Sequence, residues 1–521
     1  MRLPAVNRYS LFGLVVLALV ALFAVAWLSK PVTLPAAQQT PPRPPSVAAV
    51  STGARACPAP GTPGSHGNGV ALIAAAHPGS SHQGGAQAAS PGRATITRLG
   101  QAGGATGASL TSLSQPGTLT VSSVPAADAA ARTTTGTGTG TSGKDASKPA
   151  AQPGGVMIQA TGSMAQGLEA EQTVTGGAVT GGCASPGTDF WFALPGQQSA
   201  GVIKLYLMNT DSQASSVNVD IVTDTGPLQT GTDTGIVVPA HGLVVQSLAS
   251  LIHGSRAVGL HVHTVAGRVV AAVSESKSTH QTGQWAPASQ APAKRLVIPA
   301  MPNTPGTREL YVADPGGSDA AVKLSVAASG GTYEPTGAGA IDIPAGSASL
   351  IALPSLSGIY GAAVLTANAP VIAAMVVPGG QTDGPGAMTA AAPALREQGV
   401  VADAGQRGET STLVLSAPDG AAKVRMVTGA SGLTAGAASG TSTQVISIKS
   451  KHSVKVTAPK ASHGSSAYAI LLTPLPGSGP VYAGRVLAES SGLVLDLLPV
   501  TSALTTVPLP AISGTLINAA P

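Results

Sequence analysis

The sequence predicts a mainly β protein that follows a single amino-terminal membrane helix. Three observations support this: an uncharged apolar run over residues 11–28, many glycine and proline residues (66 and 42 of 521), and β-type alternation that recurs about every 105 residues. Aromatic residues make up only 3% of the chain, so Val, Leu, Ile and Ala must build the core. Short strands joined by Gly and Pro turns suit this composition, and no apolar stripe of helical period follows residue 30.

The apolar run over residues 11–28 is long enough for a membrane anchor. A helix of that length covers most of a hydrocarbon core about 30 Å thick, with Trp27 at the interface. A signal peptide has a shorter apolar core and a cleavage site directly after it. We therefore expect an uncleaved anchor over residues 11–29, with cleavage and secretion as the alternative.

The charges that flank the run set its orientation. Arg2 and Arg8 precede it, and only Lys30 follows it closely. The positive-inside rule then places residues 1–10 in the cytoplasm and the rest of the chain outside the cell membrane.

Only two cysteines occur, Cys57 and Cys183. Because the expected compartment is oxidising, a disulfide between them is the simplest interpretation. Two free thiols or links to other chains are the alternatives. A zinc site made by the pair would need further ligands that the flanking residues do not supply.

The composition divides the rest of the chain. Residues 30–56 are rich in proline and predict an extended stalk. Residues 57–180 contain short strand-like pieces between Gly, Ser, Thr and Ala tracts, which predicts a low-complexity β region. Residues 501–521 are a carboxy-terminal tail.

Three similar units lie between these regions. Leu205 and Leu310 differ by 105 residues, as do Pro239 and Pro344, which begin equivalent turns. In the third, looser copy this turn becomes the segment 449–452. The predicted units are residues 181–290, 291–395 and 396–500.

A repeat of this length predicts tandem immunoglobulin-like β-sandwiches, because about 100 residues of alternating strands can bury one face of each of two sheets. The alternative is a β-propeller in which each unit supplies two blades. The halves of a unit do not resemble each other, which favours the sandwiches.

Charge and short motifs exclude several function classes. Beyond residue 30, 24 basic side chains balance 22 acidic ones, so nucleic acid is not an expected partner. The Gly-rich stretch at residues 138–145 lacks the Ser or Thr that a phosphate-binding loop needs after its lysine. Ser274 and Lys277 have the spacing of penicillin-binding enzymes, but their segment reads as the end of a strand rather than a helix.

His261 and His263 would point to one face of a strand. Such a pair binds zinc if a third ligand approaches, for which His241 and His253 are the nearest candidates in sequence. A solvent-facing pair needs no metal, so we expect no metal and no cofactor.

The segment Phe190, Trp191 and Phe192 concentrates scarce aromatic residues. Alternation places both phenylalanines on one face of a strand, in the core of the first unit, and Trp191 on the other. Trp191 could instead stack on a sugar, and Trp285 and Tyr206 are open to the same two interpretations.

The anchor, the Cys57-Pro58 pair, the segment from Cys183 to Phe192 and the following segment 205–210 resemble the DUF5719 family. The resemblance extends from about residue 57 to residue 506. It implies a membrane-anchored or secreted actinobacterial protein of the cell envelope and carries over no catalytic residue.

Together these features favour a non-enzymatic envelope protein, anchored in the cell membrane, that binds wall polymer or an envelope partner. A wall-modifying hydrolase or transferase is the second hypothesis, and it requires a cavity that gathers residues such as Asp189, Asp224 or His261. A carbohydrate-binding module that uses Trp191 is the third.

Overall fold

The computed structural model confirms a mainly β protein. It describes residues 8–28, 47–58, 68–75, 90–101, 109–123, 154–174, 181–228, 234–276, 284–337, 339–377, 386–402, 409–431, 433, 441–458, 467–489 and 494–508. The chain divides into two units, one made of Met1–Val47 and Pro508–Pro521 and one of Ala48–Val507.

In the first unit the apolar run forms helix α1 (Arg8–Leu28). Among the described residues, no helix meets the length and apolarity needed to cross a membrane. Residues 1–7, most of the expected stalk and the tail beyond residue 508 lie outside the described residues. The last part of the expected stalk is not extended coil: it contributes β1 (Val47–Ala49), and β2 begins at Thr52.

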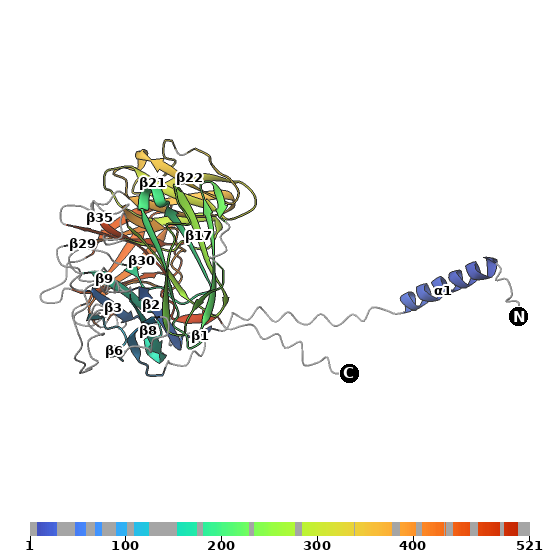
Figure 1. Cartoon of the computed structure of the whole chain (residues 1–521), viewed down its shortest axis with the longest axis horizontal. Helices are drawn as coiled ribbons and strands as arrows, with labels where there is room; N and C mark the ends of the chain where they lie inside the picture. The colour runs from blue at the N-terminus through green and yellow to red at the C-terminus, as the bar shows by residue number, and fades with distance from the viewer. Residues whose placement is uncertain are drawn as a thin grey trace, which may run out of the picture. The chain divides into compact units, whose positions relative to one another are not determined.

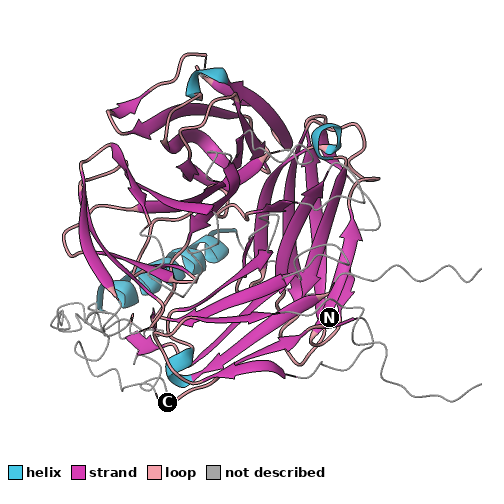
Figure 2. Ribbon diagram, turned by 90° about the vertical axis from the view of Figure 1, so that its left-hand side faces the viewer, coloured by secondary structure: helices cyan, strands magenta, loops and turns pink. Residues whose placement is uncertain are grey.

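The second unit is built from four modules of two sheets each, and Figure 2 shows that strands make up nearly all of its regular structure. Module 1 contains β2 (Thr52–Pro58), β3 (Asn68–Ala74), β4 (Ala94–Arg98), β5 (Gly100–Gln101), β6 (Ser109–Leu113), β7 (Thr120–Ser123), β8 (Gly155–Thr161), β9 (Leu168–Val174) and β10 (Gly181–Gly182). Module 2 contains β11 (Asp189–Pro195), β12 (Val202–Met208), β13 (Ser215–Thr223), β14 (Gly226–Leu228), β15 (Ile236–Val238), β16 (Gly242–Ser247), β17 (Ala257–Ala266), β18 (Val270–Ser276) and β19 (Gln284–Ala286).

Modules 3 and 4 follow in the same manner. Module 3 contains β20 (Ala293–Met301), β21 (Arg308–Asp314), β22 (Ala320–Ala328), β23 (Gly331–Tyr333), β24 (Ile341–Ile343), β25 (Ser347–Leu353), β26 (Gly361–Val377) and β27 (Ala387–Ala390). Module 4 contains β28 (Gly399–Val401), β29 (Glu409–Ala417), β30 (Ala422–Gly429), β31 (Ser442–Ile448), β32 (His452–Thr457), β33 (Ala469–Pro474), β34 (Tyr482–Glu489) and β35 (Val494–Val500). The short helix α2 (Gln197–Ala200) follows β11, and β36 (Thr506–Pro508) pairs with β1.

All four modules share one strand order. With eight main strands lettered a to h in chain order, the first sheet of each module has the order a-f-c-d and the second sheet the order e-b-g-h. In module 2 these are β11-β17-β13-β15 and β16-β12-β18-β19. In module 3 the single strand β26 serves as both f and g. Module 1 follows the same order as the others, so the region expected to be a weak β segment is a fourth copy of the repeat.

The predicted repeat of turns is visible in the backbone. The d–e turns hold His241, Gly346 and Lys451, spaced by 105 residues, at φ angles of 50°, 64° and 65°. Gly117 occupies the same turn of module 1 at 74°. A left-handed residue in each turn, even where a side chain makes it unfavourable, shows that the turn geometry is part of the repeat.

The eight sheets pack face to face in a closed ring. A hydrophobic core lies between the two sheets of each module. Further apolar clusters join the first sheet of each module to the second sheet of the next, from module 1 to 2, 2 to 3 and 3 to 4. Because both faces of a sheet are covered, strands such as β12 and β21 are buried almost continuously rather than at alternate residues.

Module 4 closes the ring on module 1. Ala71 and Ile73 of β3 pack against Val427 of β30 and Leu471 of β33, and Figure 1 shows β3 near β30. The two ends of the unit also meet, because Val50 donates a backbone hydrogen bond to Thr505 at 2.9 Å.

This architecture combines the two expected arrangements. Each module is a sandwich, and the ring gives every unit two blade-like sheets, as in the propeller alternative. The strand order is not that of an immunoglobulin domain, which keeps its first two strands in one sheet. Here strands a and b lie in different sheets, so the immunoglobulin-like label is corrected to an interleaved sandwich.

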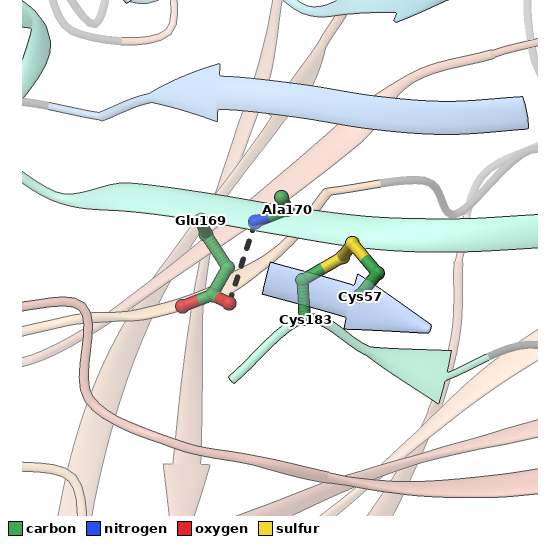
Figure 3. The surroundings of a disulfide bond; sticks show 4 residues. All are labelled: Cys57, Glu169, Ala170 and Cys183. Carbon is green, nitrogen blue, oxygen red and sulfur yellow. Dashed lines mark hydrogen bonds between the residues drawn. A yellow bond between two sulfur atoms is a disulfide. The ribbon is translucent and has the colours of Figure 1, made fainter. Parts of the chain in front are cut away.

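The disulfide between Cys57 and Cys183 is formed and buried (Figure 3). Cys57 lies in β2, and Cys183 directly follows β10. Beside the bond, Ala56 and Ala184 exchange backbone hydrogen bonds of 3.0 and 3.1 Å. The disulfide therefore fastens the last strand of module 1 to its first, at the junction with module 2.

Removal of this disulfide should destabilise the protein. For a separation of 126 residues, the chain-entropy model gives a loss of about 5 kcal/mol in the free energy of unfolding. Chemical denaturation of the Cys57→Ala/Cys183→Ala variant measures it, with reduced wild type as the matched control. Equal unfolding midpoints for the variant and the oxidised wild type would contradict the prediction.

The close packing of module 2 against module 3 should require a glycine at position 259 of β17. A Cβ at this position would lie 2.5 Å from the Ala313 Cβ and 2.7 Å from the Val222 Cγ2. Overpacking of this kind costs about 1–3 kcal/mol, so Gly259→Ala should lower the free energy of unfolding by that amount. Gly317→Ala, at a position with open space around it, is the control and should change little. Equal stability of both variants would show that the interface can relax.

Candidate functional site

Strand β11 places the aromatic segment on two faces. Phe192 is 1% exposed in the core of module 2, and half-buried Phe190 packs against the same core. The intervening Trp191 lies on the opposite face, where its ring stacks on His261 with centroids 3.7 Å apart and planes 5° from parallel. One face of the Trp191 ring is therefore already covered by a protein side chain.

Around Trp191 lies a polar group that we call the histidine cluster: Asp189, Asp220, His261 and His263. The register pairs Asp189 with His263 and Asp220 with His261 across neighbouring strands. The side chains come from β11, β13 and β17, all in the first sheet of module 2. His261 and His263 are 20% and 30% exposed, whereas both aspartates are mostly exposed.

The contacts in the histidine cluster are short. His261 Nε2 lies 2.9 Å from Asp189 Oδ1, and His261 Nδ1 lies 3.2 Å from Asp220 Oδ2. His263 Nδ1 is 3.3 Å from the same Asp220 oxygen. The structure thus joins the two histidines named from the sequence with Asp189. Asp224 is elsewhere, where it accepts the backbone N–H of Arg256.

A second concentration of polar groups lines a partly enclosed cavity of about 190 Å³, which we call the ring cavity. Strands from modules 1, 2 and 4 surround it. Its lining includes Glu169, Glu171, Gln172, Trp285 and Asp496. Among the described residues that line it there is no Lys, Arg or His, so its wall presents acidic and neutral groups.

Arginines behind the wall hold two of these carboxylates. Glu169 lies 3.2 Å from the Arg55 guanidinium, within module 1. Glu171 forms an ion pair with Arg485 of module 4, and the two side chains are 2% and 0% exposed. Both glutamates are therefore fixed acceptors in the cavity wall.

Trp285 is oriented by polar and aromatic neighbours. The Gln172 amide is oriented so that both of its polar atoms have partners. In this orientation the amide oxygen of Gln172 accepts a hydrogen bond from Trp285 Nε1 at 2.9 Å. The Trp285 ring meets Tyr206 edge to face, with centroids 5.1 Å apart. Tyr206 itself is 7% exposed between modules 1 and 2, and burial raises the pKa of its hydroxyl. The structure places this predicted binding residue behind the cavity wall.

Glu275 is a buried acidic residue that belongs to neither the histidine cluster nor the ring cavity. Its side chain is 2% exposed on β18, and its Oε1 atom makes no hydrogen bond to any described residue. Burial disfavours the charged form and raises the pKa of Glu275 to about 8. The neutral, protonated form of Glu275 is therefore favoured at neutral pH.

Sequence reasoning missed Asp220 and the acidic lining of the ring cavity. Asp220 stands at an alternate position of a predicted strand, but which strand it faces depends on register. The cavity residues belong to three modules, and those of module 4 join the others only when the ring closes.

Comparison with known proteins identifies one matching family. The DUF5719 family, a family of unknown function, matches residues 139–459. A search of curated proteins gave no match. The solved structure of Streptomyces avermitilis alpha-L-rhamnosidase complexed with L-rhamnose is 10% identical, with a TM-score of 0.12, and the alignment covers 86% of this chain and 55% of that one. The chain spans about half the length of that enzyme, and so low a score carries no argument.

The raised pKa of Glu275 predicts a pH-dependent stability. Between pH 4.5 and about 8, the folded chain keeps a proton on Glu275 that the unfolded chain has already lost. The free energy of unfolding should therefore fall by about 1.4 kcal/mol per unit as the pH rises through this window. Urea denaturation at several pH values should show this slope reduced in Glu275→Gln and retained in Glu334→Gln, which alters an exposed carboxyl. Parallel profiles for Glu275→Gln and wild type would refute the assignment.

Proposed function

Since the chain belongs to DUF5719, a family of unknown function, we propose its role from its own residues: a membrane-anchored binding protein of the cell envelope. Its ring cavity takes a neutral, hydroxyl-bearing ligand such as the end of a wall polysaccharide. The acidic and aromatic lining of that cavity is the observation that carries the proposal.

Two features support a location outside the cytoplasm. The buried Cys57–Cys183 disulfide is typical of an oxidising compartment. The uncharged sequence of residues 11–28, preceded by two arginines, supports the anchor, with a secreted form as the alternative. Both features favour work at the outer face of the membrane.

The cavity chemistry favours a sugar over other polymers. Sugars are bound by aromatic faces together with carboxylate and amide oxygens that accept from hydroxyl groups. The ring cavity provides such groups in the ring of Trp285, the amide of Gln172 and the carboxylate of Asp496. Because its described lining has no cation, it offers no partner for the charge of a phosphate-rich polymer.

A wall hydrolase is the second candidate, because Glu171 and Asp496 reach one cavity from modules 1 and 4. Binding is preferred since Glu171 is held by a fully buried arginine. A residue fixed in this way suits hydrogen-bond acceptance better than the proton transfer that glycoside hydrolysis needs.

Retention on isolated cell wall tests the proposal. Full-length protein in detergent should bind the wall, and Trp285→Leu should weaken binding about tenfold, the effect of roughly 1.4 kcal/mol. The matched control is Trp191→Leu, a second half-buried tryptophan of module 2, which should bind as wild type does. Circular dichroism of each variant checks the fold, and the isosteric Asp496→Asn gives a milder change in the same cavity.

Three outcomes separate the hypotheses. No retention of the wild type would overturn wall binding. Loss in Trp191→Leu alone would move the site to the histidine cluster. Release of soluble sugar by the wild type would support the hydrolase instead.

A further inference from the structure

We infer that Asp220, His261 and His263 form a binding site for a divalent transition metal, with zinc as the best match. Their ligand atoms all lie within 4.8 Å of one another. The inference concerns the histidine cluster alone and is independent of the ring cavity.

His261 lies between two carboxylates, an arrangement that a metal ion at one ring nitrogen can complete. A neutral imidazole carries one N–H, yet His261 has a carboxylate oxygen at each ring nitrogen, 2.9 Å away at Asp189 and 3.2 Å at Asp220. One nitrogen can donate to one carboxylate, which leaves a lone pair facing the other. A metal between Nδ1 and Asp220 turns this repulsion into coordination.

His263 gives the second argument. Its Nδ1 atom is buried and makes no hydrogen bond to a described residue, although it lies 3.3 Å from the same Asp220 oxygen. The His261 and His263 rings lie side by side with their centroids 4.7 Å apart, so both reach the same carboxylate. Coordination satisfies both Nδ1 atoms with neutral rings.

Two of the three ligand separations fit a tetrahedral ion. Ligand atoms about 2.0–2.1 Å from zinc stand roughly 3.3–3.4 Å apart in tetrahedral geometry. The separations of 3.2 and 3.3 Å from Asp220 to the two histidines are close to this value. The ligand atoms of the two histidines lie within 4.8 Å of each other, so the rings must turn toward the ion for all three atoms to bind it.

The surroundings hold the ligands in place. Asp189 accepts from His261 Nε2, which is the partner that orients a metal-binding histidine and leaves Nδ1 free to coordinate. Trp191 stacks flat on the same ring and limits its rotation. Asp189 and Trp191 thus act as positioning residues.

The donor set identifies the class of ion. Two imidazoles and one carboxylate suit zinc and the neighbouring first-row metals better than calcium or magnesium, which prefer oxygen alone. Three protein ligands leave a fourth position of a tetrahedral ion open. Because both aspartates are mostly exposed, that position faces solvent and can take water or an oxygen of a bound molecule.

Zinc titration tests the site. Full-length protein is purified without a histidine tag, stripped with a chelator and titrated calorimetrically with ZnCl₂, and bound metal is counted by elemental analysis. The His261→Ala/His263→Ala variant should lose one equivalent of zinc relative to wild type. Asp220→Asn, which preserves shape, should lose the same equivalent, and Asp189→Asn should weaken its binding about 10- to 100-fold.

The matched control is His253→Ala, which removes an exposed histidine of the same module and should bind as wild type does. Substitution with cobalt should give the visible absorption of a tetrahedral ion in wild type and not in the double variant. Circular dichroism confirms that each variant is folded. Equal zinc stoichiometry and affinity in wild type and a folded double variant would overturn the inference.

Discussion

The closure of the ring, where module 4 packs on module 1, is the contact on which the rest of the structure depends. Apolar residues of β3, β28, β30 and β33 cover each other there, and the buried pair of Glu171 and Arg485 spans the same two modules. Loss of one partner from such a pair leaves an uncompensated buried charge and costs about 3–5 kcal/mol. Closure must therefore bring both partners of the pair together, while apolar burial supplies the attraction.

The local features of the fold were readable from the sequence because they depend on neighbouring residues. The β class, the 105-residue offset and the turns at His241 and Lys451 all follow from alternation and turn chemistry. The fourth module was hidden, because Gly- and Thr-rich tracts dilute its strands. The ring itself was not readable: continuous burial of strands such as β12 shows that both faces are covered, without saying by which sheet.

The same distinction between local features and contacts between modules applies to the candidate sites. Alternation placed Trp191 opposite Phe192 and put His261 and His263 on one face, and cross-strand register then added Asp220, which no short motif marks. The ring cavity depends on contacts between modules, so its acidic lining could not be derived from any one repeat. Residues that lie within one sheet were partly foreseen, and those that meet across modules were not.

The contact between Val50 and Thr505 brings the two ends of the unit together, so the fold does not depend on which module comes first in the chain. A unit whose ends touch has no intrinsic first module, so a chain with those ends joined could begin at another module junction and enclose the same core. Four copies of one strand order, each presenting its first sheet to the second sheet of the next, make such junctions equivalent in kind. A ring of this type can arise by duplication of one module, provided that the last copy still fits the first.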